Sequence, residues 1–362
     1  MPDFIIIGGG LIGMLTAREL VNAGYRVTLL EQGTTGRESS WAGGGIISPL
    51  HPWRYVDPIT KLAAWGQQRY PTLSQSLKQE SGIDPEYCRN GLLILEPEEL
   101  DVALQWCDKT SQSAVQYGTE EITRCEPSLQ DPPERALWMP EVAQVRNPRL
   151  VKACYGAIED RVEIHQQTPV TRFLTAQGRI TGVETSQGRM TAGSVIVCAG
   201  AWSGNLLETY LPNPRIEPVL GQMILYRSSP DAIRRIVLHR DRYVIPRRDG
   251  RILVGSTLEY RGFQKQTTQA ARDELSAYAQ EHFPILRDAQ IEHHWAGLRP
   301  GSPLGIPYIG PIPGVQGLYV NAGHFRNGVV LGPASARLMA DLVLGREPIV
   351  PPAPYAVEAT RE

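Results

Sequence analysis

The sequence predicts an α/β fold with two domains, and three observations lead to this prediction. Residues 4–7 and 27–30 are short apolar runs on either side of a stretch with helical spacing, which is the order of a parallel βαβ unit. Two later apolar runs, residues 195–198 and 317–322, also lead into small residues, as buried strands of a parallel sheet do. The length of 362 residues corresponds to about two domains of roughly 150 residues each.

Composition and charge exclude several classes of protein. The net charge is −2 and the isoelectric point is near 6.4, so we expect neither a nucleic acid nor an anionic membrane as a partner. Acidic residues interrupt the Arg-rich stretch 234–248, which we interpret as a solvated hairpin and not as a phosphate-binding strip. No apolar stretch reaches the ~18 residues of a membrane span, and no signal peptide is recognisable, so a cytoplasmic protein is expected. The five cysteines form no Cys-x-x-Cys pair, and no metal site is expected.

The βαβ unit carries a dinucleotide-binding motif. Gly8, Gly10 and Gly13 satisfy the pattern G-x-G-x-x-G, which permits a tight turn, a close approach of pyrophosphate and close packing of helix on strand. The helix N-terminus adds amide donors and a positive dipole. Glu31 ends the second strand, where its carboxylate can accept hydrogen bonds from a ribose, and the neutral Gln32 argues against a 2′-phosphate. The unit therefore predicts binding of an adenine dinucleotide.

Three later segments favour FAD over NAD. Residues 37–46 combine hydroxyl groups with three glycines, which suits a backbone that lies against a phosphate and a flat ring, although a mobile surface loop is the alternative. Residues 195–202 form a second strand that ends in small residues. Residues 317–324 lead to a helix expected at 333–344, whose N-terminus can stabilise negative charge on a reduced flavin. A nicotinamide site needs no such contribution from the C-terminal part of the chain.

Taken together, these segments resemble a known family. The motif at 8–13, Glu31 and the segments 39–46, 199–202, 296–300 and 323–328 are similar to those of the D-amino acid oxidase superfamily of flavoproteins, most closely to its glycine oxidase (ThiO) family. The resemblance covers essentially the whole chain, and the last two segments are its specific part. It implies a Rossmann-like FAD domain of the glutathione-reductase type and oxidation of a small amine by O₂. Related sarcosine oxidases attach the flavin to a cysteine in the C-terminal part, whereas no cysteine follows Cys198 here, so FAD is expected to bind non-covalently.

The resemblance also assigns residues to the site. The expected cofactor contacts are Gly8, Gly10, Leu11, Ile12, Gly13, Glu31, Gln32, Glu38, Ser39, Gly43, Gly44, Gly45, Val170, Ala199, Gly200, Trp202, His324, Phe325, Arg326, Asn327, Gly328, Val329 and Val330. The expected catalytic and substrate-binding residues are Tyr243, Arg299 and Arg326. Arg299 would hold the substrate carboxylate, because a planar guanidinium forms two parallel charge-assisted bonds; a structural salt bridge is the alternative. Tyr243 would add a phenolic bond, although a strand tyrosine often only packs. Arg326 would bond the substrate or hold the backbone of the site.

The cofactor domain is expected to be discontinuous. We assign residues 1–82, 148–212 and 297–362 to it, and residues 83–147 and 213–296 to an α+β substrate domain built on an antiparallel sheet. Long helices are expected at 59–79 and 268–282. The tail from residue 348 is expected to be a mobile or strapping end.

The expected reaction is the oxidative deamination of glycine, sarcosine or D-alanine to an oxo acid, ammonia or an amine, and hydrogen peroxide, in the synthesis of the thiamin thiazole. Hydride transfer from Cα to the flavin needs no side-chain base, because positioning and electrostatics suffice. Two alternatives stay open, a D-amino acid dehydrogenase that reduces a quinone and an FAD-binding protein without catalysis. Gly45 and Leu258 stand where glycine oxidases carry methionine, which leaves the preferred amine open. A homo-oligomer, either a dimer or a tetramer, is expected.

Overall fold

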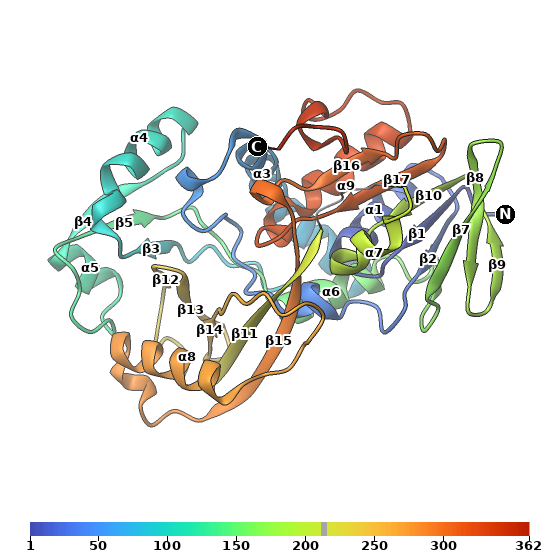
Figure 1. Cartoon of the computed structure of the whole chain (residues 1–362). Helices are drawn as coiled ribbons and strands as arrows, with labels where there is room; N and C mark the ends of the chain where they lie inside the picture. Colours follow the sequence, from blue (N-terminus) through green and yellow to red (C-terminus); the bar gives the residue numbers. More distant parts are fainter. Residues whose placement is uncertain (211–215, 362) are drawn as a thin grey trace.

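The computed structural model describes residues 1–210 and 216–361 and contains two large sheets in separate halves of the molecule (Figure 1). The first sheet consists of β1 (Phe4–Ile7), β2 (Val27–Leu30), β6 (Glu163–His165), β10 (Ser194–Val197), β16 (Tyr308–Pro311) and β17 (Leu318–Ala322). Its strand order is β16-β17-β10-β1-β2-β6, and all neighbours are parallel except β16 and β17. The α/β fold class is thereby confirmed.

Alternation along the strands of the first sheet produces two buried faces. Phe4 and Ile6 of β1 pack on one side, and Ile5 and Ile7 pack on the other, as the two-residue period of a strand requires. Helices cover the first side: α1 (Leu11–Asn22), α3 (Asp57–Ser81), α6 (Asn147–Gly156) and α9 (Gly328–Val343). A three-stranded sheet covers the second side: β7 (Val170–Ala176), β8 (Arg179–Thr185) and β9 (Gly188–Thr191).

The second sheet is antiparallel except where β3 pairs with β12. In spatial order its strands are β15 (Ile291–Gly301), β11 (Glu217–Arg227), β14 (Arg251–Gly255), β13 (Arg242–Pro246), β12 (Ile236–His239), β3 (Leu92–Ile94), β5 (Arg135–Met139) and β4 (Val115–Gly118). One face packs on α8 (Gln269–His282) and α5 (Thr119–Cys125). The other face packs on α4 (Leu100–Thr110) and carries Met223 and Tyr243. Two short helices, α2 (Glu38–Ala42) and α7 (Ser203–Leu207), complete the α-helices of the described residues.

Helix bounds agree with the sequence in two cases and differ in one. The helices expected at 59–79 and 268–282 are α3 and α8. The helix expected to begin at residue 333 begins at Gly328 instead, so that prediction of its start was wrong. Pro333 lies inside α9, where it removes the N–H that would bond the carbonyl of Val329. The hydroxyl group of Tyr70 donates to this carbonyl at 2.7 Å, which satisfies it and lets the helix start earlier.

The sequence predicted domain boundaries on both sides of the segment that contains most of the second sheet, and the structure bears differently on the two. The boundary between residues 212 and 213 lies outside the described residues. The boundary at residue 297 falls inside β15, which pairs with β11 from Ile291 to Gly301 without ending there. The division into two domains otherwise stays a prediction.

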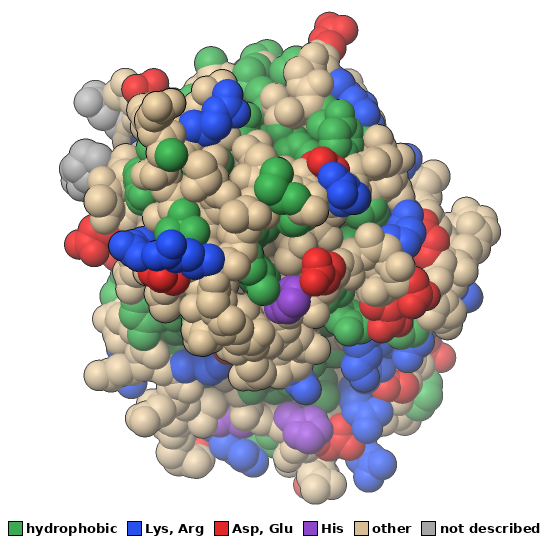
Figure 2. Space-filling model, turned by 90° about the vertical axis from the view of Figure 1, so that its right-hand side faces the viewer, with side chains coloured by type: hydrophobic (Ala, Val, Ile, Leu, Met, Phe, Trp, Pro, Cys, Tyr) green, Lys and Arg blue, Asp and Glu red, His purple; other side chains and the backbone are tan. Residues whose placement is uncertain are grey.

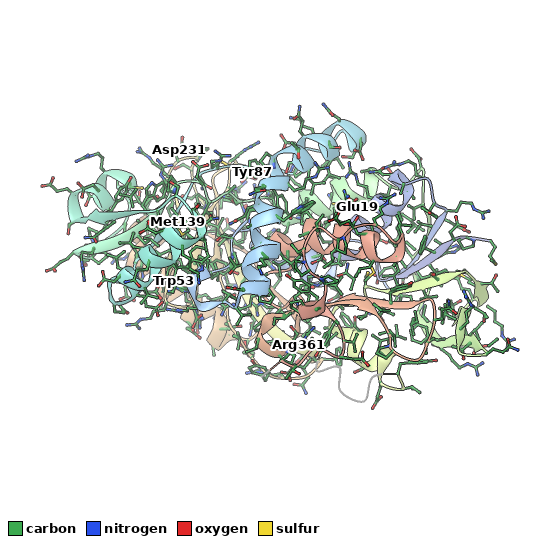
Figure 3. The ribbon with its side chains drawn as sticks, turned by 90° about the horizontal axis from the view of Figure 1, so that it is seen from above. Glu19, Trp53, Tyr87, Met139, Asp231 and Arg361 are labelled. Atoms are coloured by element: carbon green, nitrogen blue, oxygen red, sulfur yellow. The ribbon has the colours of Figure 1, made fainter. Side chains whose placement is uncertain are left out.

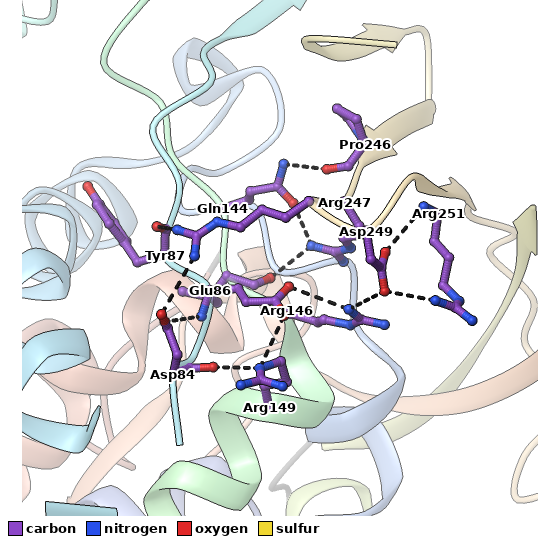
Figure 4. A network of polar contacts seen from close by, with 12 residues as sticks. Asp84, Glu86, Tyr87, Gln144, Arg146, Arg149, Pro246, Arg247, Asp249 and Arg251 are labelled. Carbon is purple, nitrogen blue, oxygen red and sulfur yellow. Dashed lines mark hydrogen bonds and ion pairs between the residues drawn. The ribbon is translucent and has the colours of Figure 1, made fainter. Parts of the chain in front are cut away.

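A polar network joins the two halves. Figure 3 places Trp53, Met139 and Asp231 in one half, Glu19 in the other and Tyr87 between them. Close to Tyr87, Arg146 pairs with Asp249 at 2.8 Å, and Arg251 pairs with the same carboxylate at 2.8 Å (Figure 4). Arg247 and Arg248, at the end of the Arg-rich stretch 234–248, belong to this region, and Arg248 is exposed as expected. Arg247 is buried, so the solvated interpretation is wrong for that residue, because Gln144, Val145 and Gly44 supply acceptors for its guanidinium in the interior.

The C-terminal tail is a strap on the first sheet. Tyr355 is fully buried and donates to the carbonyl of Pro58 at 2.8 Å. The guanidinium group of Arg361, labelled in Figure 3, stacks 3.5 Å from the ring centroid of Tyr308 and donates to the carbonyl of Ile306.

The surface matches the charge balance of the sequence. On the face seen in Figure 2, acidic and basic side chains are interspersed with apolar and neutral ones. Within residues 1–210 and 216–361, the helices do not combine the length and the apolar character that a membrane crossing requires.

Candidate functional site

A cavity of about 440 Å³ lies at the carboxyl ends of the parallel strands of the first sheet. Residues that follow β1, β2, β10 and β17 line it, among them Gly8, Glu31, Ala199 and His324. Ligands of open α/β sheets bind in this position, where the loops after neighbouring strands diverge. The cavity continues to the second sheet, where β11, β13 and β15 contribute to its wall. One continuous cavity therefore touches both halves of the chain.

The turn after β1 requires its glycines. Gly8 has a φ of +111°, and a Cβ atom there would lie 2.3 Å from the carbonyl oxygen of Cys198. A Cβ atom on Gly13 would lie 1.9 Å from the carbonyl oxygen of Gly8, so the first turn of α1 packs directly on the strand end. The hydroxyl group of Ser40 accepts the N–H of Leu11 at 2.9 Å. The helix N-terminus thus faces the cavity with one of its donors already satisfied.

Glu31 supports the turn and also faces the cavity. Its carboxylate accepts the N–H of Gly9 at 2.7 Å and the N–H of Gly33 at 2.7 Å. Each carboxylate oxygen can accept a further hydrogen bond. Glu31 can therefore hold the glycine turn and bond a ribose at the same time.

The loop of residues 43–45 forms the wall between the two sheets. Gly45 has a φ of +82°, and a Cβ atom there would lie 2.0 Å from the carbonyl oxygen of Val145. A Cβ atom on Gly44 would lie 3.3 Å from the hydroxyl oxygen of Tyr243. The backbone of this chain thus requires glycine at the position where the family pattern has methionine. Leu258, the other departure, is 40% exposed and lies outside the cavity wall.

The C-terminal part of the chain closes the opposite side. β17 leads through His324 and Phe325 into α9, whose first residues Gly328, Val329 and Val330 line the cavity. Burial lowers the pKa of His324 to about 3, so its ring is neutral. Among the described atoms, its Nε2 has no hydrogen-bond partner. The N-terminus of α9 presents its positive dipole at this wall, as the sequence predicted.

Arg299 of β15 is a buried cation. It lies at the end of the cavity whose wall is formed by the second sheet. Its guanidinium donates to the carbonyl oxygens of Leu220 and Thr257, at 3.3 and 3.2 Å, and to the hydroxyl group of Ser256 at 2.7 Å. Within the described part of the chain, no carboxylate lies within ion-pair distance of it, so the alternative of a structural salt bridge finds no support. Burial lowers the pKa of Arg299, while the nearby phenol of Tyr243 opposes that shift.

Two of the predicted residues have charged partners. Arg326 pairs with Asp241 at 3.2 Å, and Glu38 pairs with Lys265 at 2.7 Å. Both predicted residues line the cavity, so they can still contact a ligand with their remaining atoms. Their side chains also hold the cavity wall in place.

Most of the predicted site residues meet in this cavity. Of the predicted contacts, Gly13 and Asn327 lie behind the wall, and the others line it. Gly13 packs on Gly8, as described above, and Asn327 precedes the first residue of α9. Both residues shape the turns that carry the lining residues. Their direct contact with a cofactor stays a prediction.

Several lining residues were not predicted. Met223, Ser48 and Leu50 also line the cavity. The two-residue period of the expected strand 221–226 places Gly221 and Met223 on one face, so this signal was available for Met223. Ser48 and Leu50 lie in an irregular segment, where no periodicity marks the inward side chains.

The residues of the cavity fit FAD. Glycines without room for a Cβ line the end formed by the first sheet, where a pyrophosphate can approach the backbone. His324 provides a buried polar atom without a protein partner beside the N-terminus of α9. Cys198 also lines the cavity, and burial raises the pKa of its thiol to about 12, so it stays protonated and unreactive.

Comparison with known proteins agrees with this fit. A family model described as FAD dependent oxidoreductase matches residues 3–342. Glycine oxidase of Pseudomonas aeruginosa is 51% identical over 354 residues, which cover 97% of each chain. The bifunctional protein ThiO/ThiG of Trichormus variabilis is 31% identical over 350 residues, which cover 94% of this chain and 52% of that protein. The crystal structure of glycine oxidase from Geobacillus kaustophilus superposes with a TM-score of 0.93 at 27% identity, covering 100% of this chain and 99% of the other.

Proposed function

This chain belongs to the FAD-dependent oxidoreductase family and is an FAD-dependent enzyme, and we propose that it oxidises glycine and related small amines with O₂. The observation that carries the proposal is the buried guanidinium of Arg299, without a carboxylate partner among the described residues, beside Tyr243 in a cavity that fits FAD. The glycine oxidase of Pseudomonas aeruginosa supports glycine as the substrate.

Arg299 has the donors that a substrate carboxylate needs. A guanidinium has five N–H donors, and protein acceptors take three of them here. The Nε–H and one Nη2–H remain for a ligand. A buried cation without a counter-ion is costly, so the site is built to receive an anion. A carboxylate matches because it accepts two parallel charge-assisted bonds.

The residues around Arg299 would fix the substrate for reaction. Tyr243 is 6% exposed and lies next to the loop of residues 43–45, so its hydroxyl group would bond the same carboxylate. Bound FAD would supply the acceptor for the hydride from Cα and would be reoxidised by O₂. Arg299 and Tyr243 orient Cα, and the buried wall excludes water. This positioning replaces a side-chain base.

The pathway and the assembly form part of the proposal. The bifunctional ThiO/ThiG relative supports a role in the synthesis of the thiamin thiazole. We also propose a homo-oligomer, a dimer or a tetramer, and a cytoplasmic location. Light scattering of the purified protein tests the assembly.

A direct test is to mix the purified flavoprotein with glycine, sarcosine or D-alanine without oxygen and to follow the visible flavin absorbance. We expect the absorbance to disappear with at least one of these amines, and in air we expect one hydrogen peroxide for each amine oxidised. Reduction of a quinone with negligible oxygen uptake would identify a dehydrogenase instead. Flavin that no amine reduces would identify a binding protein.

The assignment of Arg299 is tested by Arg299→Met. We expect kcat/KM for glycine to fall by about 30-fold to several thousand-fold with FAD retained, because loss of one partner of a buried charge pair costs about 2–5 kcal/mol. Steady-state kinetics and flavin content measure this, with the exposed Arg287→Met as the matched control. Unchanged kinetics in Arg299→Met would mean that Arg299 only holds the strand ends.

A further inference from the structure

Arg247 is a second buried cation, and it lies behind the wall of the cofactor cavity. It follows the last residue of β13 and is 9% exposed. Its guanidinium donates to the side-chain oxygen of Gln144 at 2.5 Å, to the carbonyl of Val145 at 3.0 Å and to the carbonyl of Gly44 at 2.7 Å. Within the described residues, it has no carboxylate within ion-pair distance. Burial lowers its pKa to about 10, so it remains charged at neutral pH.

The bond to Gly44 fixes the direction of a backbone amide. The peptide bond between Gly44 and Gly45 is trans, so the carbonyl of Gly44 and the N–H of Gly45 point in opposite directions. Because the carbonyl points at Arg247, the N–H of Gly45 points away from it. Among the described atoms this N–H has no acceptor, and Gly45 lines the cavity.

Three side chains of β13 and the residue after it contact Gly44. Tyr243, Ile245 and Arg247 alternate along β13 and its end, so they share one face. From the position of a Cβ on Gly44, Tyr243 lies 3.2 Å away and Ile245 lies 3.0 Å away. The strand that places Tyr243 at the substrate end therefore also sets the conformation of the loop.

The orientation of Arg247 is itself set by its neighbours. The amide nitrogen of Gln144 donates to the carbonyl of Pro246 at 2.8 Å and to the side-chain oxygen of Asn90 at 3.1 Å. These bonds leave the amide oxygen of Gln144 to face Arg247, as Figure 4 shows. The nearby carboxylates of Glu86 and Asp249 both pair with Arg146 and lie beyond ion-pair distance of Arg247.

We propose that Arg247 is a positioning residue of the cofactor site, which directs the N–H of Gly45 toward the flavin and places a fixed positive charge behind that peptide. The proposal rests on the placement of the flavin against residues 43–45. A directed N–H and a nearby cation both favour the more electron-rich, reduced flavin. In a buried site of low dielectric their effect is stronger than it would be in water. Arg247 would therefore make the flavin easier to reduce and hold it more tightly.

The test compares Arg247→Met and Arg247→Lys with the wild-type flavoprotein. For Arg247→Met we expect a midpoint potential below that of the wild type and an FAD Kd higher by on the order of tenfold, the effect of about one lost hydrogen bond. For Arg247→Lys, which keeps the charge but not the three-way fork, we expect a potential between those of Arg247→Met and the wild type and a several-fold higher Kd. Arg248→Met is the matched control, because Arg248 is exposed and donates to the carbonyl of Tyr87.

The outcomes separate this inference from the proposed function. An unchanged potential and an unchanged Kd in Arg247→Met would overturn the inference. If Arg247→Met does not fold, an unchanged FAD Kd in Arg247→Lys overturns it instead. A wild-type protein that binds FAD but is not reduced by any amine would refute the proposed function, while the comparison of potentials would still decide the role of Arg247.

Discussion

Arg299 and Arg247 illustrate how burial decides what an arginine does in this chain. Arg326 has an exposed carboxylate partner in Asp241, and pairs with an exposed partner contribute about 0–1 kcal/mol. Arg299 and Arg247 are bound by carbonyl, hydroxyl and amide oxygens, and among the described residues they lack an anionic partner. A charge buried without a partner opposes folding, so its presence at the cavity indicates a role toward a ligand.

His324 shows the same effect for a titrating group. Burial lowers its pKa to about 3, against ~6.5 in an unfolded chain. Between these values the unfolded chain binds one proton more than the folded chain, so stability falls as the pH falls. We expect the unfolding free energy to drop by about 1.4 kcal/mol for each pH unit below ~6.5 through this residue. Urea unfolding between pH 4 and 6 should show a dependence on pH that is smaller by that amount in His324→Gln than in the wild type, and equal slopes would contradict it.

At the scale of elements, α9 depends on a contact from another helix. Its early start extends the helix from Pro333 back to Gly328, and Val329 and Val330 in that first part line the cavity. Tyr70 of α3 supplies the donor that Pro333 cannot. Burial raises the pKa of Tyr70 well above its usual range, so it remains a donor. The position at which α9 starts, in the cavity wall, therefore depends on a tertiary contact.

Replacement of Tyr70 tests whether its hydroxyl group stabilises the start of α9. We expect Tyr70→Phe to lower the unfolding free energy by about 1–3 kcal/mol, because it leaves the carbonyl of Val329 buried without a donor. We also expect weaker FAD binding, since the first turn of α9 would loosen. Chemical denaturation and flavin titration measure the two effects. Tyr25→Phe, at an exposed site, is the control and should change little. Wild-type stability in Tyr70→Phe would show that Pro333 needs no compensation.

At the scale of the whole molecule, the loop between β14 and α8 connects the second sheet to the cofactor wall. Lys265 of this loop bonds both carboxylate oxygens of Glu38, and Phe263 packs on Trp202 with ring centroids 5.5 Å apart. Glu38 and Trp202 line the cavity. Trp295 of β15 adds a bond to the carbonyl of Ala42 at 3.1 Å. The second sheet and its loop therefore contact residues of the cavity wall, so we expect them to help retain a bound cofactor.

The ion pair between Lys265 and Glu38 allows the role of this loop in FAD retention to be tested. We expect Lys265→Met to raise the dissociation rate of FAD by about two- to fivefold, because an exposed pair contributes up to about 1 kcal/mol, and to leave the melting temperature unchanged. Stopped-flow release of flavin measures the rate, with the exposed Lys109→Met as the control. If the loop does not retain the cofactor, both variants will release FAD at the wild-type rate.

Features that depend on neighbouring residues could be predicted. The strand, glycine turn and helix at residues 4–22 follow from local periodicity, and the strand alternation of 242–246 follows in the same way. Resemblance of short motifs was enough to bring Glu31, Tyr243 and Arg299 to one cavity. The start of α9 and the burial of Arg247 could not be predicted, because Tyr70 and Gln144, which accommodate them, are far away in the sequence.

The sequence by itself determined the α/β class and the dinucleotide turn, because periodicity and glycine geometry act over a few residues. Only the tertiary structure decided which arginines lack a counter-ion and which backbone amides are left free to face the cavity. Those properties depend on whether an acceptor from a distant segment arrives at the same place. For Arg247 and Gly45 that depends on how β13 packs against residues 43–45.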